Sequence, residues 1–166
     1  MGRGASYRVP FRRRREGRTD YRRRLRLLRG GQPRVVVRKS LRGLRIQFAN
    51  FEARGDRVRA TAVSNDLREF GWTAPGGNLP AAYLTGLLAG KRAASQGITN
   101  AVLDLGRDVP AHGGRLFAAV KGVLDAGVTV PHAKEVLPTD FRLTGQHISP
   151  EVAAQFAQVK SKLEAM

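Results

Sequence analysis

The sequence predicts an α/β fold with a mixed sheet, a basic extended N-terminal arm and a C-terminal helix. Residues 34–63 contain three short alternating or β-branched segments separated by turns, which is typical of an antiparallel meander. Residues 78–130 then alternate helical and strand-like segments, a βαβαβ order that leads to parallel pairing. A 42% hydrophobic content supports one core. We therefore expect one α/β domain at 18–131, after an arm at 1–17 and before a loop and helix at 132–166.

The first 17 residues show no hydrophobic periodicity. Gly2, Gly4, Pro10 and the run Arg12–Arg15 oppose a packed element in this segment. We therefore expect an extended arm that becomes ordered only on binding a partner.

A helix is expected over residues 19–29. Thr19 is the expected N-cap, Asp20 suits the first turn, and Gly30-Gly31 ends the helix. Three residues at i, i+4 and i+7 predict one apolar docking face: Tyr21, Leu25 and Leu28. Arginines around the rest of the helix are placed to meet phosphates.

Three strands follow, joined by turns at 40–43 and 54–56. The first, 34–39, contains three consecutive valines. The other two alternate apolar and polar residues, which indicates half-buried strands. Their inward residues are expected to be Leu44, Ile46 and Phe48, and then Val58, Ala60 and Ala62.

A long helix begins at Asn78-Leu79-Pro80 and runs to about Gln96. Its expected apolar face comprises Leu84, Leu87, Leu88 and Ala94, and its glycines, Gly86 and Gly90, favour close helix packing over a phosphate loop. A strand at 100–105, a helix at 114–126 and a short strand at 128–130 complete the α/β part. A last helix starts with Ser149 as cap and Pro150, and its docking stripe is Val152, Phe156, Val159 and Leu163.

The positive charge is concentrated at one end of the chain. Of 30 Lys and Arg residues, 17 lie between Arg3 and Arg45, where Glu16 and Asp20 are the only acids. That segment carries +15 of the net +17. Such a field repels itself unless a polyanion neutralises it, and nucleic acid is the obvious polyanion.

Aromatic rings are interleaved with these cations. Tyr7 and Phe11 flank Arg8, and Tyr21 precedes three arginines. Phosphate contacts combined with ring stacking are typical of proteins that bind single-stranded or looped RNA. A second basic cluster on two paired strands and their turn is expected to extend this surface: Arg34, Arg38, Lys39, Arg42 and Arg45.

Several other classes of site find little support. The chain has no cysteine, which excludes disulfides and thiolate metal sites. The three histidines lack ligand spacing, so we expect no metal, cofactor or small-molecule substrate. No apolar run approaches 18 residues and no secretory signal is evident, so we expect a cytoplasmic protein without a membrane partner.

Two alternatives to specific RNA binding remain. A metal-dependent RNA-processing enzyme needs a carboxylate cluster, for which Asp104, Asp108 and Asp125 are the candidates. Their expected positions, at a strand end, in a loop and on a helix surface, favour structural roles, so we expect no catalysis. A general polyanion-binding protein or RNA chaperone, held by charge alone, would not need the interleaved rings.

The sequence resembles a known family over nearly its whole length. The matching segments are YRVPFRRRREGRTDYRRRLRLLRGGQPRVVVRKS (7–40), SNDLREFGW (64–72), NLPAAYLTGLLAGKRA (78–93), AVLDLG (101–106), residues 117–132 and DFRLTGQHI (140–148). They are similar to the archaeal and eukaryotic type of the universal large-subunit ribosomal protein number eighteen, which binds 5S ribosomal RNA (rRNA).

This resemblance implies a structural role in the large ribosomal subunit. The protein is expected to anchor 5S rRNA to large-subunit rRNA in the central protuberance, beside neighbouring ribosomal proteins. Longer family members continue past the C-terminal helix, so we carry over no extended C-terminal contact. The RNA-binding residues that we expect are Tyr7, Arg8, Phe11, Arg12, Arg13, Arg14, Arg15, Arg18, Tyr21, Arg22, Arg23, Arg24, Arg38, Lys39, Ser40 and Arg42.

Overall fold

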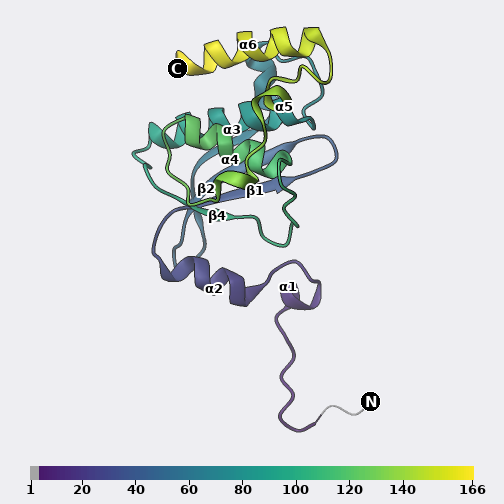
Figure 1. The fold of residues 1–166 in the computed structure, drawn as a ribbon. Coiled ribbons are helices and arrows are strands. Elements are labelled where there is room, and N and C mark those ends of the chain that lie inside the picture. Colours follow the sequence, from purple (N-terminus) through teal and green to yellow (C-terminus); the bar gives the residue numbers. More distant parts are fainter. Residues whose placement is uncertain (1–3) are drawn as a thin grey trace.

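The computed structural model describes residues 4–166 and has a four-stranded mixed sheet between two sets of helices (Figure 1). This confirms the predicted fold class. The elements, in chain order, are α1 (Arg12–Arg15), α2 (Tyr21–Arg29), β1 (Arg34–Lys39), β2 (Leu44–Asn50), β3 (Arg57–Val63), η1 (Ser64–Phe70), α3 (Leu79–Ala94), β4 (Val102–Asp104), α4 (Arg115–Asp125), η2 (Lys134–Val136), α5 (Asp140–Thr144) and α6 (Pro150–Glu164).

The antiparallel meander β1-β2-β3 is present as predicted, and the sheet order is β3-β2-β1-β4. Alternation buries Ala60 and Ala62 of β3 under the helices. Val58, however, is 47% exposed, so its predicted inward position is wrong. A bulge in the pairing of Phe48 and Ala49 with β3 shifts the register there, which turns the start of β3 away from the core.

The parallel part of the sheet is shorter than the sequence predicts. β4 pairs with β1 over three residues, but the expected strand at 128–130 is reduced to one bridge, between Asn100 and Thr129. Val128 and Val130 are nevertheless buried. The next residue, Pro131, has no N–H to continue a ladder, which explains why pairing ends there.

Helices α3 and α4 cover one face of the sheet (Figure 1). They approach so closely that a Cβ atom on Gly86 would meet the Ala119 carbonyl, and one on Gly122 would meet the Tyr83 carbonyl. The predicted close helix packing at the glycines is therefore present. Helix α3 is buried on nearly all sides, so its apolar surface is broader than the predicted apolar face. At its C-terminal end Ala93 is buried, whereas the predicted Ala94 is exposed.

Helix α6 packs on α3, on the side away from the sheet (Figure 1). The Ser149 hydroxyl caps it by accepting the Val152 N–H at 3.3 Å. All four residues of the predicted docking stripe are buried, and the Phe156 ring lies 5.5 Å from that of Tyr83. The C-terminal helix thus extends the core, as predicted.

The N-terminal elements lie across the sheet from α3 and α4 (Figure 1). Residues 1–3 of the predicted arm lie outside the described residues, and Arg12–Arg15 form one helical turn where an extended chain was expected. Asp20, not Thr19, caps α2 by accepting the Arg22 and Arg23 N–H groups at 3.0 and 3.1 Å. A carboxylate accepts two such donors better than a hydroxyl.

The predicted apolar docking face of α2 is present only in part, because Tyr21 and Leu28 are partly buried but Leu25 is exposed. No residue of α2 is buried, and Leu25 is 53% exposed. The helix instead turns Arg24 and Leu27 toward the sheet, because Arg24 finds an acidic partner there.

Replacing Gly122 by alanine tests the α3–α4 packing. The new Cβ would overlap backbone atoms of α3, so we expect the free energy of unfolding to fall by about 1–3 kcal/mol or more. Urea denaturation monitored by circular dichroism measures this loss. The control is Gly30→Ala, at a position with ordinary backbone angles and open space around it. Equal stability of the two variants would contradict the packing.

Candidate nucleic-acid interface

Strand alternation gives the sheet a second face that α3 and α4 do not cover. In β1, Val35 and Val37 point into the core, whereas Arg34 and Arg38 belong to the other face. Asp104, from the parallel neighbour β4, lies on this face as well, because it pairs with Val36 in register. The uncovered face therefore brings together cations and one carboxylate.

A chain of ion pairs crosses this face and reaches α2. Arg34 donates to Asp104 at 2.7 Å and to Asp56, in the β2–β3 turn, at 2.6 Å. Asp56 in turn accepts from Arg24 of α2, with both carboxylate oxygens 3.0 Å from the same guanidinium nitrogen. Arg38 donates to the side chain and the carbonyl of Asp104 at 3.2 and 2.7 Å. We call these five residues the arginine–aspartate network.

Arg34 is the centre of this network and is only 1% exposed. The expectation that it belongs to a basic surface is therefore wrong. A guanidinium is stable at such burial only when carboxylates neutralise it. Asp56 and Asp104 come from a turn and a strand that are distant in sequence, so the basic pattern alone does not reveal the burial.

The two carboxylates are held ionised. Burial raises the pKa of Asp104, but the Arg38 charge, the Gly106 N–H and Arg34 outweigh it, so this pKa lies below its usual value. Burial also raises the pKa of Asp56, and the hydrogen bonds from Arg34 and Arg24 again bring it below its usual value. Both aspartates therefore stay charged at neutral pH.

Gly106 connects the arginine–aspartate network to the loop that follows β4. Its N–H donates to Asp104 at 2.9 Å, and its carbonyl accepts from Arg23 at 3.2 Å. With φ at +61° and the Arg38 guanidinium 2.9 Å from where a Cβ would stand, this position requires glycine. The loop thus becomes a second point of attachment for α2.

The first candidate surface is formed by α1, α2 and the loop after β4, and we call it the arm–helix surface. Arg12 and Arg18 both pair with Glu16, and Arg13 donates to Thr19 at 2.9 Å. Within residues 4–166, no hydrogen bond or ion pair engages the side chains of Arg14, Arg15, Arg22, Arg26 and Arg29. These five charges are available to a polyanion.

Phe11 and Tyr21, two of the three predicted aromatic residues, lie on the same surface. The Phe11 ring is 73% exposed, and its centroid is 5.4 Å from that of Tyr21. Tyr7 is also exposed. Close by, a hollow of about 570 Å³ is lined by Arg14, Thr19, Asp20, Tyr21, Arg22, Arg23, Gly106 and Arg107.

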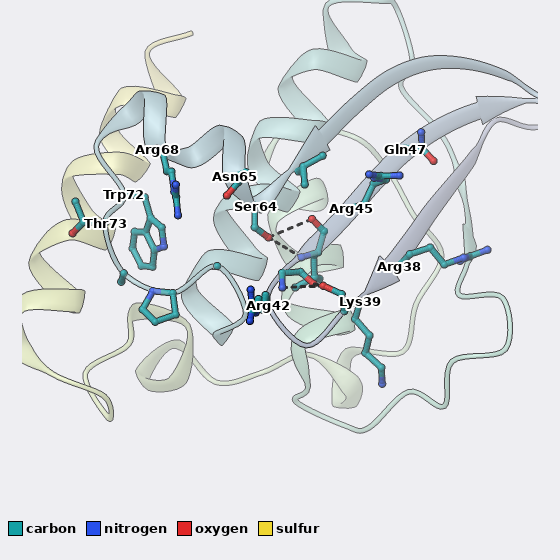
Figure 2. A pocket seen from close by; sticks show the side chains of 17 residues that line it. Arg38, Lys39, Arg42, Arg45, Gln47, Ser64, Asn65, Arg68, Trp72 and Thr73 are labelled. Atoms are coloured by element: carbon teal, nitrogen blue, oxygen red, sulfur yellow. Dashed lines mark hydrogen bonds between the residues drawn. The ribbon is translucent and has the colours of Figure 1, made fainter.

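The second candidate surface lies at the other end of β1, around the β1–β2 turn. It is a groove of about 800 Å³, and Figure 2 shows its lining side chains. We call it the hairpin groove. It contains the predicted site residues Arg38, Lys39, Ser40 and Arg42 and also Arg45 of the predicted second basic cluster, and it adds Gln47, Asn65, Arg68 and Trp72.

The walls of the hairpin groove are fixed by hydrogen bonds. The Ser64 hydroxyl accepts the Leu44 N–H at 2.8 Å, which ties η1 to the start of β2. Arg115 of α4 donates to the carbonyls of Ser40 and Gly77 at 3.2 and 3.0 Å. Ser40 itself bonds to Gly43 within the turn. The groove is therefore preformed.

The structure separates the predicted site residues by role. Arg24 and Arg38 are partly engaged in the network, and Ser40 shapes the turn. Sequence reasoning missed Arg68, Trp72 and Arg107, which lie outside the basic segment. The only sequence signal for Arg68 and Trp72 is that both fall in the SNDLREFGW segment of the resemblance.

The three aspartates of the alternative enzyme are not grouped. Asp104 belongs to the arginine–aspartate network, while Asp125 accepts from Tyr83 and Lys121 at 2.8 and 2.9 Å. The described residues contain no group of three or more His, Asp or Glu placed to hold a metal ion. In the same residues, no helix combines the length and apolarity that crossing a membrane requires.

Comparison with known proteins identifies the family. The family model described as "Ribosomal large subunit proteins 60S L5, and 50S L18" matches residues 5–101. A relative named "Large ribosomal subunit protein uL18" from Korarchaeum cryptofilum is 54% identical, over 90% of this chain and 76% of the relative. A second protein of that name, from Methanothrix thermoacetophila, is 47% identical, over 98% of this chain and 99% of the relative. The chain belongs to the uL18 family of large-subunit ribosomal proteins.

A further uL18 relative, from Haloarcula marismortui, is 51% identical over 90% of this chain and 80% of its own length. The resemblance found in the sequence is thereby confirmed. The family match includes α1, α2, β1 to β3 and the hairpin groove, whereas the loop after β4, which completes the arm–helix surface, follows the matched residues. The individual RNA-binding residues stay predictions.

Replacing Asp104 by asparagine tests the arginine–aspartate network. The buried Arg34 would keep one carboxylate partner, the partly exposed Asp56, instead of two, so we expect the free energy of unfolding to fall by about 3 kcal/mol at pH 7. The stability that a lowered pKa confers is present above the unfolded-state pKa, about 3.9, and is lost as the pH falls through the folded-state pKa. Melting temperatures from pH 6 to pH 3 should therefore fall more steeply in the wild type than in the variant.

Asp108→Asn provides the matched control, because this loop carboxylate has no side-chain partner among the described residues. It should leave both the stability and its pH dependence unchanged. If Asp104→Asn behaved in the same way, the network would not hold the sheet face together.

Proposed function

We propose that this protein binds 5S rRNA and anchors it to large-subunit rRNA in the central protuberance, beside neighbouring ribosomal proteins. It acts in the cytoplasm as a structural component of the large subunit, without catalysis. The observation that carries the proposal is the arm–helix surface, whose five unpartnered arginines extend from a folded domain of the uL18 family.

Phosphate contact would supply most of the affinity. Arginine offers a planar fork that grips phosphate oxygens in pairs, and 24 of the 30 basic residues are arginine. The arginine–aspartate network holds α2 against the sheet, so its outer arginines keep fixed spacings. Fixed spacing allows a folded RNA to be distinguished from an arbitrary polyanion.

Exposed rings would add contacts to bases. Phe11 and Tyr21 stand together beside Arg22 and Arg23, where an unpaired base can stack while its phosphates meet arginines. A polyanion without bases, such as heparin or an anionic lipid surface, gains nothing from such rings. Their position therefore favours RNA over heparin-like polymers or anionic lipid.

The first test is binding to 5S rRNA and to a scrambled RNA of equal length across a salt series. If about 8 to 10 phosphates are neutralised, the slope of log K against log salt should be about −6 to −9. Fluorescence anisotropy of labelled RNA measures this slope. Binding should be tighter to 5S rRNA than to the scrambled RNA.

A slope near −2 would show that most of the basic segment does not engage RNA. Equal affinity for both RNAs, at any slope, would reduce the protein to a general polyanion binder. Cleavage of either RNA in the presence of Mg²⁺ would revive the enzyme alternative.

Deleting residues 1–17 tests the role of the arm. Residues 11–17 contact residues 18–21 and Arg107 at the surface, and none of residues 4–17 is buried. We therefore expect 5S rRNA binding to weaken by at least about tenfold, through the lost phosphate contacts, while the melting temperature stays nearly unchanged.

The matched control replaces Arg54 and Arg59 by alanine. Both are exposed and lie outside the arm–helix surface, so this variant separates the loss of placed contacts from the loss of net charge. A large drop in the melting temperature of the deleted protein would mean that the arm contributes to the core.

A further inference from the structure

The hairpin groove contains an unsatisfied hydrogen-bond donor. Within residues 4–166, three buried side-chain polar atoms have no hydrogen-bond partner, and Trp72 Nε1 is the one that belongs to the groove lining. Trp72 is only 2% exposed, and Figure 2 shows its indole nitrogen on the side of the ring that faces the other lining residues. A buried donor without a partner is unfavourable in the free protein and is satisfied if a ligand brings an acceptor.

The groove also contains four cations without partners. Within the described residues, no hydrogen bond or ion pair engages the side chains of Lys39, Arg42, Arg45 and Arg68. None of the residues that line the groove is acidic. Its field therefore selects an anion with several charges, or an anionic polymer.

The remaining polar groups suit a nucleobase. Asn65 and Gln47 carry amides that both donate and accept, and Figure 2 shows them among the labelled side chains. Arg68 and Trp72 both line the groove, so a flat ligand that reaches both meets a guanidinium and the donor edge of a ring. Phosphate alone needs neither amides nor the indole N–H.

The size and rigidity of the groove indicate a short single strand. A volume of about 800 Å³ accommodates about two nucleotides on the usual scale of ligand pockets. Its walls are fixed by Ser64 and Arg115, which tie the turn to η1 and α4. A continuous duplex presents phosphates but keeps its bases stacked inside, out of reach of Trp72.

We propose that the hairpin groove binds a single-stranded RNA segment, with one unstacked base accepting the Trp72 N–H and its flanking phosphates held by Arg42, Arg45 and Arg68. This rests on the proposed function, because it assigns a second, base-contacting site to an rRNA-binding protein. The hairpin groove lies at the opposite end of β1 from Asp56, the aspartate that pairs with Arg24 of α2. One protein can therefore hold two RNA segments at once.

Trp72 is the only tryptophan, so its fluorescence reports on this groove alone. The full-length protein is titrated with a single-stranded hexamer of uridines, whose bases stack weakly, and in parallel with a blunt-ended RNA duplex and with sodium tripolyphosphate. We expect the hexamer to quench Trp72 to saturation. The duplex and tripolyphosphate should leave the emission nearly unchanged, even where anisotropy or competition shows that they bind.

The variant Arg45→Ala/Arg68→Ala should weaken the quenching titration by about tenfold or more, through two lost phosphate contacts. Both side chains are exposed and unpartnered, so the fold should be unaffected. The matched control Arg54→Ala/Arg59→Ala removes equal charge outside the groove and should titrate like the wild type.

Quenching by tripolyphosphate equal to that by the hexamer would mean a simple anion site and would overturn the proposal, as would equal quenching by the duplex. Tight, selective 5S rRNA binding with no Trp72 response to the hexamer would overturn it while leaving the proposed function intact. Hexamer quenching without preference for 5S rRNA would support the groove site and contradict the proposed function.

Discussion

The arrangement of the basic half of this protein depends on Arg34. Its guanidinium is buried between Asp56 and Asp104, and through these two carboxylates it joins β1, the β2–β3 turn and β4 to α2. Ion pairs of this kind add little net stability, because desolvation offsets their attraction. Their role here is to position α2 against the sheet. This helix buries no residue, and it is held by the Asp56 carboxylate and the Gly106 carbonyl, which accept from its arginines.

This network separates an apolar half of the molecule from a cationic half. Above the sheet, small residues let α3 and α4 meet at backbone distance, and α6 closes the apolar core. Below it, aspartates neutralise the inner arginines, and among the described residues Arg14, Arg15, Arg22, Arg26 and Arg29 have no side-chain partner. The apolar half therefore supplies the folding free energy. The cationic half holds the charged side chains that an apolar core cannot accommodate.

The sequence predicts the periodic elements well, and it predicts poorly what depends on long-range partners. The meander, α3 and α6 follow from alternation, from the Asn78 and Ser149 caps and from helical spacing, all of which are local signals. The exposure of Leu25 and the burial of Arg34 depend on Asp56 and Asp104, which are far away in sequence. Likewise, η1 is a short 3₁₀ segment without helical periodicity, so nothing local indicates that it brings Arg68 and Trp72 to the β1–β2 turn.

The stability of α2 depends on how the charges of its arginines are neutralised. A nine-residue helix is marginal alone, and α2 adds mutual repulsion among its arginines. The Asp20 cap, with its pKa lowered mainly by the Arg23 N–H, and the Arg24–Asp56 pair offset part of this repulsion. Phosphates along the outer face would offset the rest. On the proposed function, RNA binding and the order of α2 would therefore be coupled: the RNA would stabilise the helix that contacts it, while the core keeps that helix in place.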